Sequence, residues 1–191
     1  MGSNYVTDPA VFLIDTLFSL YILAVMLRFL LQWTQADFYN PVSQFLVKAT
    51  HPPLRIMRRF IPAVGRIDTS SLVLALVLQM LANFSILAIK GLSIGIVALA
   101  LLSVTDLVKM LLDILVYAIF AGAILSWFAA GSYSAASSIL YSLTEPVLSV
   151  CRRLLPDFGG IDLSPLLALV LLQLAKMMIL PPLQQLASLL S

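Results

Sequence analysis

The sequence has few charged residues and few of the side chains that bind metals or form disulfides. Lys and Arg together number 11 and Asp and Glu number 9, so only 10% of the 191 residues are charged, whereas 61% are hydrophobic. A soluble domain of this size needs a more strongly charged surface. The single cysteine excludes an internal disulfide, and the single histidine leaves no Cys/His cluster for a metal. These absences predict an all-α integral membrane protein with no bound metal.

Motifs that mark catalytic sites are also scarce. The chain contains no H-E-x-x-H and no glycine-rich loop of the kind that holds phosphates. One histidine also leaves little choice of general base. We therefore expect a protein that is not an enzyme, carries no cofactor and binds no nucleic acid.

Four stretches are apolar and long enough to cross a bilayer, which takes about 20 residues. They cover residues 10–33, 70–89, 104–128 and 163–180. The shorter apolar stretch 91–103 is expected to be a linker, and residues 1–9 a polar N-terminal tail. Pro181 and Pro182 are expected to end the last helix, which leaves 183–191 as an amphipathic tail.

An internal duplication organises the chain, because residues 41–68 recur without a gap as 135–162. Self-similarity at a fixed offset is the mark of a repeat architecture. We therefore expect two tandem repeats, 10–90 and 104–182, each with two membrane helices around one segment. The identical pairs include Thr50 and Thr144, Pro52 and Pro146, Arg58 and Arg152, Arg59 and Arg153, Pro62 and Pro156, Gly65 and Gly159, and Asp68 and Asp162.

The two duplicated segments, 41–62 and 135–156, are too short and too polar to cross a membrane. Asn40 followed by Pro41 predicts the start of a helix. His51-Pro52-Pro53 predicts a break into two short helices, since proline removes a backbone donor. Apolar and basic side chains then fall on opposite faces, so we expect each segment to be proline-bent and amphipathic and to lie in the membrane interface.

The distribution of basic residues predicts the orientation. Each repeat has two spans, so both segments must lie on one side of the membrane. By the positive-inside rule that side is cytoplasmic and both termini are periplasmic. The rule applies because seven basic residues lie on the segment side against Lys90 and Lys109 near the other, the seven being Lys48, Arg55, Arg58, Arg59, Arg66, Arg152 and Arg153.

The basic residues of the segments admit several roles. They are candidates to bind anionic lipid headgroups, a phosphate or an acidic partner, and the plainer alternative is that they only fix topology. Our preferred single assignment is structural: one arginine of each pair bonds Asp68 or Asp162 and so joins the segment to the next helix. The arginines that are candidates for lipid or partner binding are Arg55, Arg58, Arg59, Arg152 and Arg153. The other residues expected to shape the segments are Pro52, Pro62, Gly65, Pro146, Pro156 and Gly159.

Polar side chains also occur inside the expected spans, where they are costly and usually face other helices or a water path. Hydrogen bonding between helices is the favoured interpretation, and a permeation path is the alternative. A further charged set on one helix face is expected to satisfy itself near the interface, namely Asp106, Lys109 and Asp113. The polar residues of the spans are Gln79, Asn83, Gln173 and Lys176.

The motif T-x-P-x-L-x-x-x-R-R-x-x-P-x-x-G-x-x-D-x-S occurs twice, at residues 50–70 and 144–164. Together with Arg28 and Trp33, it resembles the YggT family over residues 10–180. In the second copy Gly122 replaces Arg28, so any role of that arginine belongs to the first copy alone.

The resemblance implies a small multi-pass protein of the bacterial inner membrane, with plastid relatives in the thylakoid. Bacterial relatives are associated with the cell-division gene neighbourhood and with osmotic stress tolerance, and plastid relatives with cytochrome maturation and nucleoid distribution. Our first hypothesis is a scaffold or assembly factor that docks anionic lipid or a partner membrane protein through its basic segments. The alternative is a transporter or channel subunit for a small ion or osmolyte, and a homo-oligomer is possible in either case.

Overall fold

The computed structural model of the chain describes residues 4–62, 67–128, 134–155 and 162–190. The described residues form six helices and the fold is all-helical. In chain order the helices are α1 (Asn4–Trp33), α2 (Pro41–Met57), α3 (Thr69–Ile89), α4 (Ile96–Phe128), α5 (Ala135–Leu154) and α6 (Ser164–Leu189).

Four of these helices are long and apolar enough to cross a membrane, which confirms the expected number of spans. They are α1, α3, α4 and α6. Large apolar side chains on them face outward, such as Phe12 and Met178, with exposed fractions of 67% and 74%. In water such exposure would be unfavourable, whereas in a bilayer these side chains contact lipid. The chain is therefore a multi-pass membrane protein.

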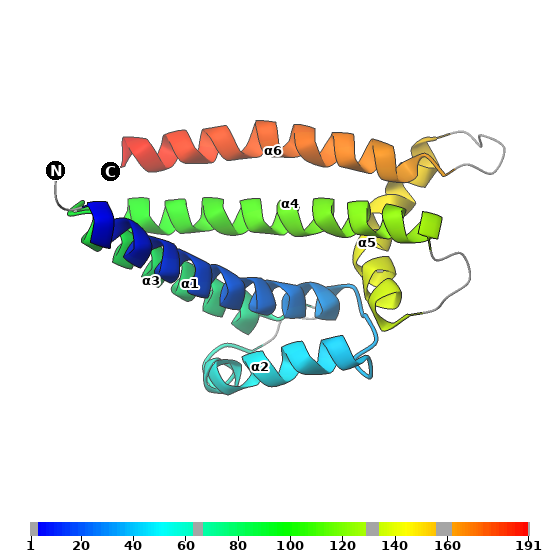
Figure 1. The fold of residues 1–191 in the computed structure, drawn as a ribbon, viewed down its shortest axis with the longest axis horizontal. Helices are drawn as coiled ribbons and strands as arrows, with labels where there is room; N and C mark the ends of the chain where they lie inside the picture. Colours follow the sequence, from blue (N-terminus) through cyan, green and yellow to red (C-terminus); the bar gives the residue numbers. More distant parts are fainter. Residues whose placement is uncertain (1–3, 63–66, 129–133, 156–161, 191) are drawn as a thin grey trace.

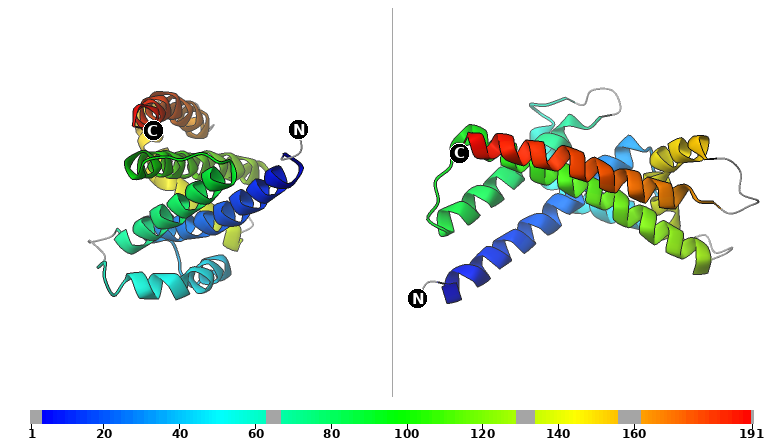
Figure 2. Two further views of the ribbon diagram at one scale, coloured as in Figure 1. Left: turned by 90° about the vertical axis from the view of Figure 1, so that its left-hand side faces the viewer. Right: turned by 90° about the horizontal axis from the view of Figure 1, so that it is seen from above.

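The spans pack in pairs, α1 against α3 and α4 against α6, and α4 also packs against α3. Figure 1 shows that α1 begins and α6 ends at the same end of the bundle. Helix α5 lies toward the opposite end, α2 runs beside the second half of α1, and the views in Figure 2 agree with this arrangement. The two repeats therefore have the same orientation, as an even number of spans in each requires.

Each short amphipathic segment is one bent helix, so the expected break into two helices is wrong. Helix α2 contains Pro52 and Pro53, and α5 contains Pro146. Figures 1 and 2 show that α2 changes direction along its length. Proline removes a hydrogen bond and bends a helix, but the helix continues where neighbouring groups satisfy the freed carbonyl groups.

Three other expected boundaries differ from the structure. Helix α1 begins at Asn4, so residues 4–9 of the expected N-terminal tail are helical. Helix α4 begins at Ile96, so most of the expected linker 91–103 is helical. Helix α6 runs through Pro181 and Pro182 to Leu189, so the expected break and separate tail are wrong. The turn that leads out of α3 contains Gly91 with φ +69°, a conformation that glycine adopts without strain.

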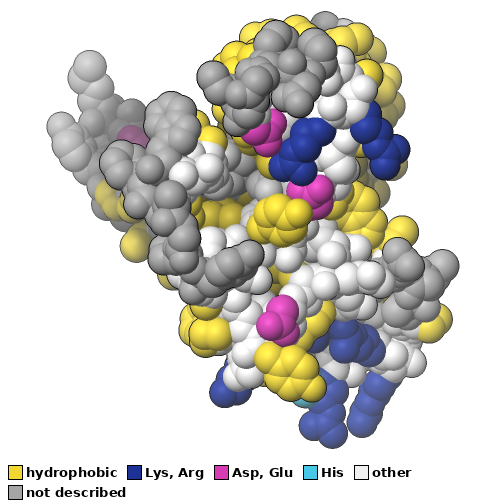
Figure 3. All heavy atoms as spheres, turned by 90° about the vertical axis from the view of Figure 1, so that its right-hand side faces the viewer, with side chains coloured by type: hydrophobic (Ala, Val, Ile, Leu, Met, Phe, Trp, Pro, Cys, Tyr) yellow, Lys and Arg dark blue, Asp and Glu magenta, His cyan; other side chains and the backbone are white. Residues whose placement is uncertain are grey.

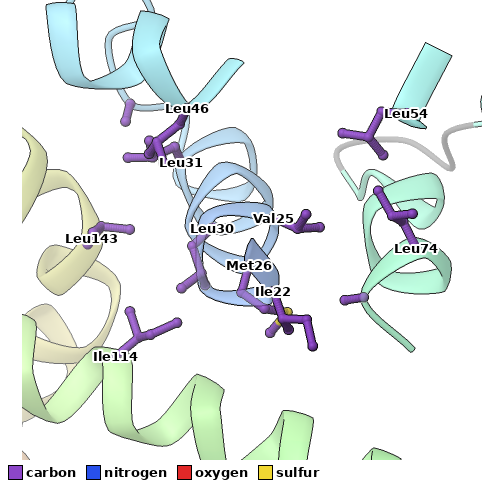
Figure 4. Close-up of a cluster of buried hydrophobic side chains, with 12 residues drawn as sticks. Ile22, Val25, Met26, Leu30, Leu31, Leu46, Leu54, Leu74, Ile114 and Leu143 are labelled. Atoms are coloured by element: carbon purple, nitrogen blue, oxygen red, sulfur yellow. The ribbon is translucent and has the colours of Figure 1, made fainter. Parts of the chain in front are cut away.

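Helix α1 supplies the centre of the main hydrophobic core, shown in Figure 4. Its side chains Ile22, Val25 and Leu30 are at most 1% exposed. Leu46 and Leu54 of α2 belong to the same cluster. The bent segment is therefore part of the packed interior of the first repeat. A smaller cluster joins α4, α5 and α6 and contains Leu115, Ile119, Leu148, Cys151, Ala168 and Leu172.

Candidate functional site

The bend of α2 is held by two polar side chains of α1. Pro53 has no N–H to donate to the carbonyl of Ala49, and the hydroxyl of Tyr21 donates to this oxygen instead, at 3.3 Å. The guanidinium of Arg28 donates to the carbonyl of Val47 at 3.1 Å and to the hydroxyl of Thr50 at 2.9 Å. Arg28 is 5% exposed, so these bonds replace water that cannot reach it.

The predicted ion pair of the first repeat is present between Arg58 and Asp68. The guanidinium lies 2.5 Å from Oδ2 of Asp68, which also accepts a bond from the hydroxyl of Ser71 at 2.9 Å. Burial of Asp68 by itself raises its pKa, but the hydrogen bonds from Arg58 and Ser71 outweigh this effect and lower the pKa overall. The pair joins the end of α2 to the start of α3.

The corresponding pair of the second repeat joins Arg152 to Asp162 at 3.2 Å. Here the guanidinium also donates to both carboxylate oxygens of Glu145, each at 3.0 Å. The carboxylate of Asp162 accepts the backbone N–H of Ser164 at 2.9 Å and so caps α6. Burial lowers the pKa of Arg152, but the two carboxylates outweigh it and raise the pKa. The side chains of this pair are more exposed than Asp68.

The other three arginines of the segments face outward. Arg55, Arg59 and Arg153 are exposed and make no ion pair with any residue that the structure describes. Figure 3 shows basic side chains at this end of the molecule in two groups, a lower one over α2 and an upper one near α5. Exposed apolar side chains accompany the lower group, with Ile56 62% and Phe60 79% exposed. A surface that combines cations with apolar side chains suits a bilayer interface or a partner.

Several residues of the expected motif lie outside the described part of the chain. These are Gly65, Arg66, Pro156 and Gly159. Pro62 is described, and its carbonyl accepts a bond from the hydroxyl of Thr69 at 2.6 Å. This bond is a second link between the bent segment and the start of α3.

Two of the four polar residues expected inside the spans meet the same carboxylate. The side-chain amides of Gln79 and Asn83 donate to Oδ2 of Asp106 at 3.3 and 2.9 Å. Asn83 also donates to the hydroxyl of Ser103 at 3.2 Å. This cluster joins α3 to α4 and agrees with the favoured interpretation, hydrogen bonding between helices.

The other two polar residues lie elsewhere. Lys176 of α6 bonds Asp113 of α4, and Gln173 is exposed. The four residues therefore do not line one common path within the described bundle. The expectation that Asp106, Lys109 and Asp113 satisfy one another on one helix face is wrong as well, because the two carboxylates bond different neighbouring helices.

The partners of three carboxylates were not identified from the sequence. Asp106, Asp113 and Glu145 each complete a contact that only the fold brings together. A usable signal existed for Asp106 and Asp113, since a carboxylate inside a span needs a partner. No comparable signal pointed to Glu145, which replaces His51 in the duplication.

The segment Gly91–Gly95 fits the G-x-S-x-G pattern, which in hydrolases places a nucleophilic serine between a strand and a helix. In this chain the pattern lies between helices α3 and α4, where no strand precedes it. His51, the only histidine, lies on α2, which is not one of the two helices that flank the pattern. The surroundings are therefore not those of a nucleophile elbow. Within the described ranges no group of three or more His, Cys, Asp or Glu side chains is placed to hold a metal.

Comparison with known proteins gives two matches to one family and several relatives. The CCB3/YggT family model matches residues 7–89 and again 101–183, segments that begin 94 residues apart like the duplicated motif. An uncharacterized protein of Pseudomonas aeruginosa is 42% identical over 172 residues, 89% of this chain and 87% of that protein. The Escherichia coli K12 protein YggT, described as uncharacterized, is 37% identical over 166 residues, 87% of this chain and 86% of that protein. No solved structure matches the chain.

The two matched segments together cover most of the chain, and each contains one ion pair between a bent segment and the next span. The chain therefore belongs to the CCB3/YggT family, and it contains two tandem segments that each match the family model.

Proposed function

We propose that the protein is a non-enzymatic scaffold or assembly factor of the bacterial inner membrane. Its bent segments α2 and α5 lie at the cytoplasmic interface and dock onto anionic headgroups or an acidic partner protein. The family's associations with cell division and osmotic stress indicate the processes in which such docking operates.

One observation carries the proposal: three arginines at this end are exposed and have no acidic partner among the described residues. Arg58 and Arg152 have structural ion pairs, whereas Arg55, Arg59 and Arg153 do not. Arginine forms bidentate bonds to phosphate and carboxylate, and each basic residue near an anionic membrane surface contributes about 1 kcal/mol of attraction. The unpaired arginines therefore supply most of the docking energy.

The test replaces the free arginines and leaves the paired ones intact. Arg55→Gln, Arg59→Gln and Arg153→Gln are combined, and Lys90→Gln at the opposite end serves as the control. Affinity purification from native membranes, followed by quantitative mass spectrometry, measures co-purified proteins and retained anionic lipid. We expect both to fall in the triple variant and to stay unchanged in the control. Growth after a shift to high osmolarity gives a second readout. Unaltered partners and lipids in the triple variant would refute the proposal.

A transport function is the second candidate, because charged groups lie inside the spans at Asp106, Asp113 and Lys176. Ionisable residues at this depth are costly and often mark ion pathways. Ion flux into liposomes that contain the purified protein tests it. Transport predicts flux that is lost in Gln79→Leu and kept in Gln173→Leu, whose side chain faces outward. Absence of flux in the wild-type protein rejects this candidate.

A further inference from the structure

The second repeat contains a cavity at the position where the first repeat has the buried side chain of Arg28. Its volume is about 670 Å³, within the range of small-molecule sites, and it lies between α4, α5 and α6. Apolar side chains such as Ile119, Leu140 and Leu169 form most of its wall. Thr144, Arg152 and Asp162 supply polar groups at one part of it. The cavity therefore suits a molecule with an apolar body and a polar head.

The duplication explains why this space is open. Gly122 lines the cavity at the position that Arg28 occupies in the first repeat. A Cβ atom on Gly122 would have no neighbour within 4 Å, so a side chain there has room. In the first repeat Arg28 is buried and bonds the hydroxyl of Thr50. The second repeat keeps this hydroxyl as Thr144 but has no guanidinium to bond it.

The charges around the two equivalent aspartates also indicate that the second repeat lacks a positive group. In the first repeat, Arg28 and Arg58 accompany the carboxylate of Asp68. In the second repeat, Arg152 bonds two carboxylates, those of Glu145 and Asp162. At these positions the second repeat has one cation fewer and one anion more than the first repeat. A bound molecule that carries a positive group would restore the balance.

We propose that the cavity binds a phospholipid with a primary-amine headgroup. The ammonium group takes the place of the Arg28 guanidinium and bonds Thr144 and the carboxylate of Asp162, while an acyl chain covers the apolar wall. A purely anionic lipid fits less well, because Arg152 is already bonded to Glu145 and Asp162. The inference goes beyond the proposed scaffold function, since it concerns the cavity wall with Asp162, and Glu145 bonded to Arg152 beside it, and not the free arginines.

Native mass spectrometry of the purified protein with added phosphatidylethanolamine or phosphatidylglycerol tests the inference. We expect the wild-type protein to bind phosphatidylethanolamine at least about tenfold more tightly than phosphatidylglycerol, a difference of about 1.4 kcal/mol. Gly122→Arg should fill the cavity as Arg28 does and abolish this binding. Gly122→Ala is the matched control, because one methyl group leaves the cavity open and binding intact.

A second variant separates the charge from the volume. Glu145→Gln with Asp162→Asn removes the anionic groups and keeps the cavity, so lipid should still bind but without preference for the amine. This outcome supports the assignment of the ammonium position. Equal binding of the two lipids by the wild-type protein, or unchanged phosphatidylethanolamine binding in Gly122→Arg, would overturn the inference. Both outcomes are independent of the arginine variants that test the scaffold function.

Discussion

Asp68 and Asp162 occupy the same position in the two repeats but have different surroundings. The side chain of Asp68 is fully buried, whereas that of Asp162 is 51% exposed. Both bond the first arginine of the pair that precedes them. Because water screens an exposed ion pair, the first pair stabilises the fold more than the second.

This difference predicts unequal effects of neutralisation. Asp68→Asn should destabilise the protein by about 1.5–3 kcal/mol, the usual loss for a hydrogen bond to a charged group. Asp162→Asn should cost less than about 1 kcal/mol, as expected of an exposed pair. Thermal melting of the protein in detergent measures both, with Asp8→Asn on the exposed start of α1 as the control. Equal melting temperatures for all variants would contradict a structural role of the pairs.

The lowered pKa of Asp68 also predicts how stability depends on pH. A carboxyl group whose folded-state pKa lies below the unfolded value of about 3.9 stabilises the folded state above that value. This contribution is lost as the pH falls through the folded-state pKa. The melting-temperature difference between the wild-type protein and Asp68→Asn should therefore be largest near neutral pH and shrink below about pH 4. A difference that grows on acidification would show that the sign is wrong.

At the scale of elements, the bent helix α2 depends on side chains from α1. Prolines remove backbone hydrogen bonds, and the freed polar groups must be satisfied because they are buried beside other helices. Tyr21 satisfies the carbonyl of Ala49, which Pro53 leaves without its helical donor, and Arg28 bonds the carbonyl of Val47 in the same turn. This arrangement explains how a sequence that predicts two short helices forms one.

Arg28→Met therefore removes the main support of the bend. It leaves the carbonyl of Val47 and the hydroxyl of Thr50 without their charged donor, and should destabilise the protein by about 3 kcal/mol. Tyr21→Phe removes one neutral bond and should cost about 1 kcal/mol. Thermal melting measures the effects, and Tyr39→Phe, at a side chain that is 90% exposed, is the control. If Arg28→Met melts like the wild-type protein, other contacts hold the bend.

The same example shows what the sequence alone can predict. The number of spans, the presence of two tandem repeats and the arginine–aspartate pairs follow from local pattern and from the fixed offset of the duplication. Whether Pro52 and Pro53 end a helix depends on donors about 30 residues away in the chain, and no local pattern contains them. The partner of Asp106 was likewise unpredictable, because it depends on how α3 and α4 face one another.

At the scale of the molecule, the duplication places both bent segments away from the end of the bundle at which the two chain termini lie (Figure 1). The amide of Asn40 donates to the carbonyl of Ala135 at 2.6 Å, a direct link between the two segments. The copies are joined here but are not equivalent. The first is closed around Arg28, whereas the second has Gly122 and a cavity. The two copies therefore differ at one equivalent position, where the first has a buried arginine and the second has a glycine in a cavity wall.

The shared orientation predicts that both segments are accessible from one side of the membrane. The native cysteine, Cys151, is buried and is first replaced by serine. Single cysteines are then introduced as Arg59→Cys, Arg153→Cys and Leu92→Cys. The positive-inside rule predicts that an impermeant maleimide labels Leu92→Cys in intact spheroplasts. It should reach Arg59→Cys and Arg153→Cys only after permeabilisation. Labelling of these two from opposite sides would rule out parallel repeats. If both Arg59→Cys and Arg153→Cys were labelled before permeabilisation, the repeats would still be parallel, but the predicted topology would be inverted.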